Sequence, residues 1–118
     1  MTEINTKVTF EPLRRESNGN VAGTLVLKIY GNWDGDDFDH NADSKDFSFP
    51  RGGEQNIDEF KFDIPIKIIL LEVTLSAKVH EKTAGQCCVQ GHVHVKPKFP
   101  PIGGGIGKDL DPNCHPIP

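Results

Sequence analysis

The sequence predicts an all-β protein: an antiparallel β-sandwich, or a partly open barrel, of about six strands with an irregular Pro/Gly-rich C-terminal arm. Three observations support this class. Apolar and polar residues alternate with period two over long stretches, which is the pattern of a half-buried strand. Turn residues separate these stretches at hairpin spacing. No stretch repeats apolar residues at i, i+3, i+4 and i+7 over three turns, so no helix is expected.

The strongest hairpin signal lies within residues 66–98, where two alternating segments specify each other. Apolar residues occupy the odd positions of both 71–80 and 87–96. The joining residues Thr83-Ala84-Gly85 fit a three-residue loop, with Gly85 at the position that requires a positive φ. The resulting register pairs side chains that suit one another. These pairs are Val79 with Val89, Leu75 with Val93, Val73 with Val95, and Glu72 with Lys96.

A second hairpin is expected over residues 4–33. Asn18-Gly19 lies between two alternating segments, and Asn-Gly is the strongest short-range signal for a two-residue type I′ turn. Pro12 has no N–H to donate, so the first strand is expected at a sheet edge or a bulge. On the second strand the alternation places Trp33 on the core face. The predicted pairs are Phe10 with Leu27, Val8 with Ile29, and Pro12 with Leu25.

Residues 34–46 interrupt the alternation and are expected to form a loop, because they hold six aspartates in thirteen residues. After this acidic loop, Phe47 and Phe49 predict a short strand. The next strand is expected over 60–66, where the apolar residues alternate again. Pro65 and a change of phase at 68–69 predict a bend or bulge into the strand that follows.

The chain changes character at Pro97. Residues 97–118 hold six prolines and four glycines, a composition that predicts neither a ladder nor a helix. The sequence therefore divides into a single β-sandwich domain at 1–96 and a C-terminal arm at 97–118. The arm carries candidate residues for docking on a partner or on a second copy of the chain: Pro100, Pro101, Ile102, Ile106 and Leu110.

Composition limits the classes of partner and compartment. The 118 residues are enough for one domain with a core, and the net charge of −4 argues against a nucleic-acid partner. No apolar run is long enough for a transmembrane helix, and residues 1–10 lack the order of a signal peptide. Three cysteines without C-x-x-C spacing predict a reduced, cytoplasmic protein with Cys87 in the core. A mature secreted chain remains the alternative.

The acidic loop is the first candidate site. Calcium takes six to eight oxygen ligands, which clustered Asp and Asn side chains often supply. The spacing is not that of an EF-hand, since Ala42 stands where Gly is required and Ser48 where Glu is required. The alternative is a solvated acidic connection that protects a sheet edge. The calcium ligands predicted here are Asp34, Asp36, Asp37, Asp39, Asn41 and Asp43.

The order of an apolar strand, an Asp-rich loop and the later segment EFKFDIP is similar, over scattered positions, to calcium-dependent lipid-binding sandwiches of the C2 type. The second acidic loop of that family is missing, so the chain is not assigned to it. The resemblance implies peripheral lipid contact through calcium.

The histidines are the second candidate site. His92 and His94 stand two residues apart on a polar face, and such a pair binds Zn²⁺ when a neighbouring strand adds a third ligand. Ser76 is expected opposite His92, which suggests a nucleophile–base pair, but no third group to orient the imidazole is evident. Histidines on a solvated sheet face are the commoner alternative.

Three functions follow, in order of preference. The first is a non-enzymatic binding or assembly module whose arm mediates self- or partner-association, because no catalytic constellation is evident. The second is a calcium-dependent ligand- or lipid-binding sandwich that uses residues 34–46. The third is a small β-barrel isomerase or metal-dependent hydrolase centred on His92 and His94.

Overall fold

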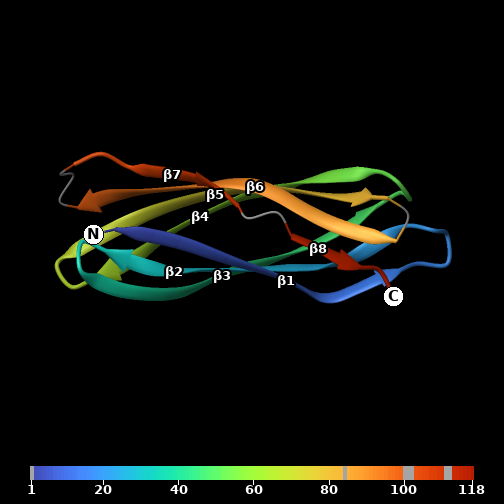
Figure 1. The fold of residues 1–118 in the computed structure, drawn as a ribbon, viewed down its shortest axis with the longest axis horizontal. Helices are drawn as coiled ribbons and strands as arrows, with labels where there is room; N and C mark the ends of the chain where they lie inside the picture. The colour runs from blue at the N-terminus through green and yellow to red at the C-terminus, as the bar shows by residue number, and fades with distance from the viewer. Residues whose placement is uncertain (1, 84, 100–102, 111–112) are drawn as a thin grey trace.

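A computed structural model of the chain describes residues 2–83, 85–99, 103–110 and 113–118, without the side chains of residues 42 and 43. Two antiparallel sheets pack face to face in an elongated sandwich of 50 × 20 × 19 Å (Figure 1). The predicted all-β sandwich class is therefore confirmed. The strands are β1 (Glu3–Arg15), β2 (Val21–Trp33), β3 (Asp36–Phe49), β4 (Glu54–Ile66), β5 (Ile69–Lys82), β6 (Gln86–Phe99), β7 (Ile106–Asp109) and β8 (Asn113–Pro116).

The first sheet has the order β1-β2-β3, and its first hairpin differs in register from the prediction. Phe10 pairs with Leu25, and Val8 pairs with Leu27. The turn is longer than two residues: the Gly19 N–H donates to the Glu16 carbonyl, and Gly19 takes a φ of 92°. A second irregularity lies between Phe10 and Leu13. The bulge expected near Pro12 is present, and the predicted pairings are wrong.

β3 corrects the prediction of an acidic loop. Residues 36–46 continue without a break into Phe47 and Phe49 as one 14-residue strand, paired along its length with β2. A shift of register between Val26 and Lys28 breaks its alternation. β3 is an edge strand, and charged side chains on an edge prevent pairing with other chains. The aspartates therefore belong to the sheet.

The second sheet is built on β4-β5-β6, and its β5–β6 hairpin has the predicted register. Ser76 lies opposite His92, and all four predicted inward and charged pairs are present. Gly85 has the expected positive φ, at 97°. The link between β4 and β5 is a tight turn at Lys67-Ile68, where a bend or bulge was expected.

The C-terminal arm is part of the second sheet, which corrects the prediction of an irregular segment. β6 continues to Phe99, beyond the predicted boundary at residue 96. β7 then pairs with residues 92–95 of β6, and β8 pairs with residues 86–89. Both short strands lie along the edge of β6 that β5 leaves free.

A continuous apolar core fills the space between the sheets. Trp33 and Cys87 belong to it, as predicted, and Leu110 of the arm reaches it as well. Across the edges of β3 and β4, His40 stacks on Phe62 with ring centroids 4.9 Å apart. No helix in the described part of the chain is long and apolar enough to span a membrane.

Candidate functional site

The predicted calcium ligands are spread over a turn and both faces of β3. Asp34 lies in the β2–β3 turn, exposed and with a positive φ. Asp37 and Asp39 lie on either side of the buried Phe38 and face away from the core. Asn41 is exposed as well, and the side chain of Asp43 lies outside the described residues. A strand turns successive side chains to opposite faces, so these oxygens do not converge as a loop would allow.

Three of these carboxylates already have protein partners. Asp36 pairs with Lys67 Nζ at 2.7 Å, and Asp39 pairs with Lys28 Nζ at 3.1 Å. The Asn32 amide donates to Asp37 at 2.9 Å. The described residues contain no group of three or more His, Cys, Asp or Glu that could hold a metal ion. Calcium binding stays a prediction from the sequence.

One histidine of the predicted pair lies next to a carboxylate that the sequence did not indicate. His92 Nδ1 lies 3.0 Å from Asp109 Oδ1, because β7 pairs His92 with Asp109. A Ser76–His92–Asp109 series would resemble a hydrolytic triad in its residue types. The ring is turned the other way, however. A Cβ built on Gly107 would lie 2.9 Å from His92 Nε2, which places that nitrogen toward β7 and away from Ser76 on β5.

His92 is thus positioned to hold the arm. The His92 ring is half exposed, at 51%, and no hydrogen bond joins it to Ser76 in the described structure. His94 also lies against the arm, since a Cβ on Gly105 would come 2.5 Å from its ring. The glycines of the arm allow it to pass close over both rings. Zinc binding by His92 and His94 stays a prediction.

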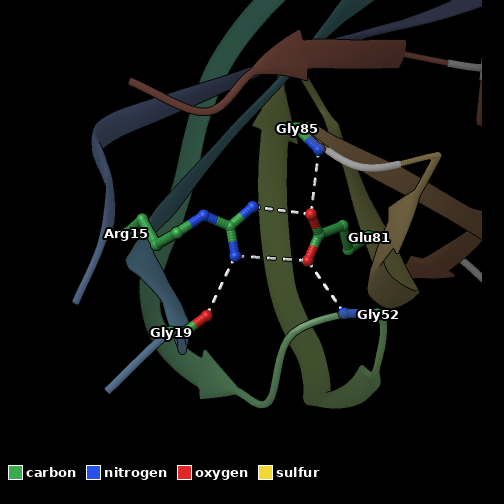
Figure 2. A network of polar contacts seen from close by, with 5 residues as sticks. All are labelled: Arg15, Gly19, Gly52, Glu81 and Gly85. Carbon is green, nitrogen blue, oxygen red and sulfur yellow. Dashed lines mark hydrogen bonds and ion pairs between the residues drawn. The ribbon is translucent and has the colours of Figure 1, made fainter. Parts of the chain in front are cut away.

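The most buried charge in the described chain lies at the end of the sandwich where three turns meet (Figure 2). The Glu81 side chain is 2% exposed and pairs with Arg15 at 2.6 Å. Glu81 also accepts the backbone N–H groups of Gly52 at 2.8 Å and Gly85 at 2.9 Å, while Arg15 donates to the Gly19 carbonyl. We call these residues the clamp. The clamp joins the first hairpin turn, the link between the sheets and the β5–β6 turn.

The clamp shifts the titration of its carboxylate. Hydrogen bonds from Arg15 and then from Gly85 and Gly52 lower the pKa of Glu81 from 4.5 to about 2, against the opposing effect of burial. Sequence reasoning missed this pair because its members are 66 residues apart and neither belongs to a motif. The alternation in β5 gave the only signal: Glu81 occupies an odd position, on the face that is otherwise apolar.

The cysteines differ from the prediction of a reduced set. Cys88 on β6 forms a disulfide with Cys114 on β8, which lies directly opposite in the register. Cys87 is free and buried. Burial raises the pKa of the Cys87 thiol to about 11, with a further rise from the nearby charge of Glu81. A disulfide is typical of an oxidising compartment, so the expectation of a reduced cytoplasmic protein loses its support.

At the end of the sandwich away from the clamp, an apolar row crosses the outer face of the second sheet. Pro65, Leu70 and Phe99 are cross-strand neighbours on β4, β5 and β6, and Ile68 projects from the adjacent turn. Ile68 is 87% exposed and Phe99 is 70% exposed. We call these four residues the apolar end. Exposure of apolar side chains to water is unfavourable in free energy, and clusters of exposed apolar side chains mark interaction sites.

Ion pairs border the apolar end on the side of the sheet centre. Lys98 Nζ lies 3.0 Å from Asp63, and Lys96 Nζ lies 3.4 Å from Glu72. An apolar centre with a charged margin is the usual composition of a protein–protein contact surface.

The predicted docking residues of the arm fall into three groups. Leu110 is buried, 5% exposed, so it is not free to dock elsewhere. Ile106 is 37% exposed and lines a recess of about 410 Å³ near the apolar end, together with Trp33, Ile69 and Pro97. Pro100, Pro101 and Ile102 lie outside the described residues.

One sequence signal could have located the apolar end. Residues 68–71 read Ile-Ile-Leu-Leu, and a strand that alternates its faces cannot bury four consecutive side chains on one side. At least part of this run had to face outward.

Comparisons of the chain with known protein families, with curated proteins and with solved structures find no significant match.

Proposed function

We propose that this protein is a non-enzymatic binding or assembly module, and that it associates with a second copy of the chain through the apolar end. The single observation that carries the proposal is the exposure of Ile68 and Phe99 on one contiguous row with Pro65 and Leu70. Burying an Ile or Phe side chain that is otherwise exposed contributes about 1.5–3 kcal/mol each. Two such side chains would supply an anchor of the kind that dominates small interfaces.

The position of the arm supports the same surface. The arm leaves β6 after Phe99, and its Ile106 lines the recess close to the apolar end. A partner seated on Phe99 would therefore contact the arm as well. The ion pairs of Lys98 and Lys96 would form the charged margin of that contact.

The experiment compares three single variants with the wild type by light scattering over a dilution series from about 1 mM to about 1 µM, the range in which modest interfaces dissociate. We expect Ile68→Asp and Phe99→Asp to remove concentration-dependent association. Tyr30→Asp is the matched control, since Tyr30 is an exposed aromatic residue of the first sheet, 40% exposed, and outside the apolar end. Thermal melts establish that all three variants are folded. Equal association in wild type, Ile68→Asp and Phe99→Asp would refute the proposed surface.

A further inference from the structure

Residues 113–118, which include β8, lie along the first part of β6, and we call them the latch segment. β8 pairs with residues 86–89 of β6. Beyond this ladder, Asn113 Nδ2 donates to the Val8 carbonyl at 2.9 Å, and the Ile117 N–H donates to the Gly85 carbonyl at 2.7 Å. The non-covalent attachment that these contacts provide is therefore mainly polar.

The other short strand of the arm has an apolar anchor, which the latch segment lacks. Leu110, directly after β7, is 5% exposed, and its N–H donates to the Gly91 carbonyl at 2.9 Å. A Cβ built on Gly91 would lie 2.9 Å from a Leu110 methyl carbon, so Leu110 fills the space that the glycine leaves. None of residues 113–118, all of them described, is fully buried. Apolar burial therefore holds β7 more firmly than it holds the latch segment.

His115 makes the bound position of the latch segment less favourable. Its ring packs edge-on against Phe10 of β1, with ring centroids 5.1 Å apart. His115 Nε2 is buried and has no hydrogen-bond partner in the described structure. A buried polar atom without a partner costs free energy, because in water the same atom would be hydrogen-bonded. Release of the segment would remove this cost.

The disulfide between Cys88 and Cys114 opposes that release, and one of its sulfurs is accessible. Cys114 is exposed, whereas Cys88 is 3% exposed. A thiolate of a dithiol reductant can attack the Cys114 sulfur, which breaks the protein disulfide and releases Cys88 as a thiolate that takes up a proton. The second thiol of the reductant then displaces Cys114. The protein gains two thiols and two electrons, and the reductant becomes a cyclic disulfide.

The latch segment also covers the remaining thiol. Cys87 is free and buried, and His115 lies directly opposite it in the pairing of β6 with β8. Cross-strand neighbours have their side chains on the same face. His115, which also contacts Phe10, therefore covers Cys87 from the edge of β6 that β5 leaves free. Departure of the segment would open this edge.

We propose that the Cys88–Cys114 bond is a redox switch: it holds the latch segment in place against the unfavourable burial of His115, and its reduction by a dithiol releases the segment and opens the Cys87 thiol to solvent. β7 and Leu110 stay in place in both states. The switch goes beyond the proposed function, since it acts at the beginning of β6, whereas Phe99 of the apolar end lies at the last residue of the same strand.

The first test measures how fast iodoacetamide alkylates Cys87, followed by the mass of the intact protein under native conditions. Cys87 is the single free thiol both in the oxidised wild type and in the Cys88→Ser/Cys114→Ser double variant, which lacks the disulfide. We expect alkylation to be at least about tenfold faster in the double variant, because a disulfide typically changes such an equilibrium by more than this factor. Equal rates would overturn the proposal.

Hydrogen exchange of the wild type, before and after treatment with dithiothreitol, tests the release without any substitution. We expect the amides of residues 86–89 and 113–117 to exchange at least about tenfold faster after reduction, while those of 106–110 keep their protection. Unchanged exchange in the latch segment would overturn the proposal. Loss of protection throughout the second sheet would also overturn it, because reduction would then unfold the sheet rather than release one segment.

His115→Phe in the double variant tests the contribution of the buried ring nitrogen. Phenylalanine has no polar atom to leave without a partner, so we expect the segment to stay bound longer and the alkylation of Cys87 to slow by at least about threefold. His40→Phe is the matched control, because His40 stacks on Phe62 across the edges of β3 and β4, and it should leave the rate unchanged. An equal or faster rate with His115→Phe would overturn the proposal.

Discussion

Removing the charge of Glu81 should be among the most destabilising conservative changes in this chain. Glu81→Gln keeps the shape of the side chain but leaves Arg15, which is 19% exposed, without its counter-charge. The carboxylate accepts four hydrogen bonds, two from Arg15 and one each from Gly52 and Gly85. A glutamine has one acceptor oxygen, so part of this set would face an amide NH₂ group.

Two arguments give similar values for the free energy of unfolding that Glu81→Gln would remove. Breaking a buried ion pair by removing one partner costs about 3–5 kcal/mol, and the partial exposure of Arg15 favours the lower end. The pKa of Glu81 falls from 4.5 to about 2, and at about 1.4 kcal/mol per unit this corresponds to roughly 3–4 kcal/mol. We therefore expect Glu81→Gln to lower the free energy of unfolding at pH 7 by about 3 kcal/mol.

The same contribution should depend on pH in a defined direction. Because the pKa of Glu81 is lower in the folded state than in the unfolded state, its stabilisation is complete above pH 4.5 and is lost as the pH falls toward 2. The difference in stability between wild type and Glu81→Gln should shrink through this window.

The assay is urea unfolding followed by the fluorescence of Trp33, the single tryptophan, which is buried in the core. Glu54→Gln is the matched control, because Glu54 pairs with Lys78 at 3.2 Å in an exposed setting, and we expect it to cost less than about 1 kcal/mol. If Glu81→Gln cost no more than Glu54→Gln, or if its effect did not change between pH 7 and pH 2, the clamp would not stabilise the fold as described.

Three further predictions concern the arm and the metals. Leu110→Ala should lower the free energy of unfolding by about 2–4 kcal/mol, whereas Ile106→Ala on the same arm should cost less than about 1 kcal/mol; urea titrations of both compare a buried with an exposed position. Cys88→Ser should cost about 3 kcal/mol, because the disulfide closes a loop with a sequence separation of 26, and a melt under reducing conditions should leave the variant unchanged while lowering the wild type to match it. Millimolar calcium should raise the midpoint of a thermal melt if the aspartates of β3 bind it, and zinc should do so if His92 and His94 bind it; a midpoint that EDTA, calcium and zinc leave unmoved would remove both metal hypotheses.

The two hairpins show what alternation can decide. Both have the predicted apolar residues on the inner face, but only the β5–β6 pairing has the predicted register. A slip of two residues leaves every side chain on the same face, so the pattern alone cannot detect it. In the first hairpin, Asn18-Gly19 was assigned to a two-residue turn, whereas Gly19 with its positive φ closes a wider one.

β3 was missed for a related reason. Its inner positions include His40 and Lys45, which contact Phe62 and Phe60 across the edge rather than entering the core. The register shift opposite Val26 then moves the alternation out of phase. An edge strand with charged side chains on both faces resembles a loop in composition, and only its pairing with β2 distinguishes the two.

The structure of the arm could not be predicted, because it depends on contacts that the sequence alone does not define. Three cysteines leave several pairings open, and only the register brings Cys114 opposite Cys88. Leu110 is an isolated apolar residue between aspartates, and its burial follows from the space above Gly91. Of the candidate sites, the histidine pair was correctly placed on one strand, while the apolar end required knowledge of which residues flank Leu70.

Sedimentation velocity of the wild-type chain over the same concentration range tests the central claim, assembly, most directly. We predict a sedimentation coefficient that rises with concentration, and a fitted mass that exceeds the 13.0 kDa of one chain at the upper end. A single species of one-chain mass at every concentration would contradict self-assembly through the apolar end.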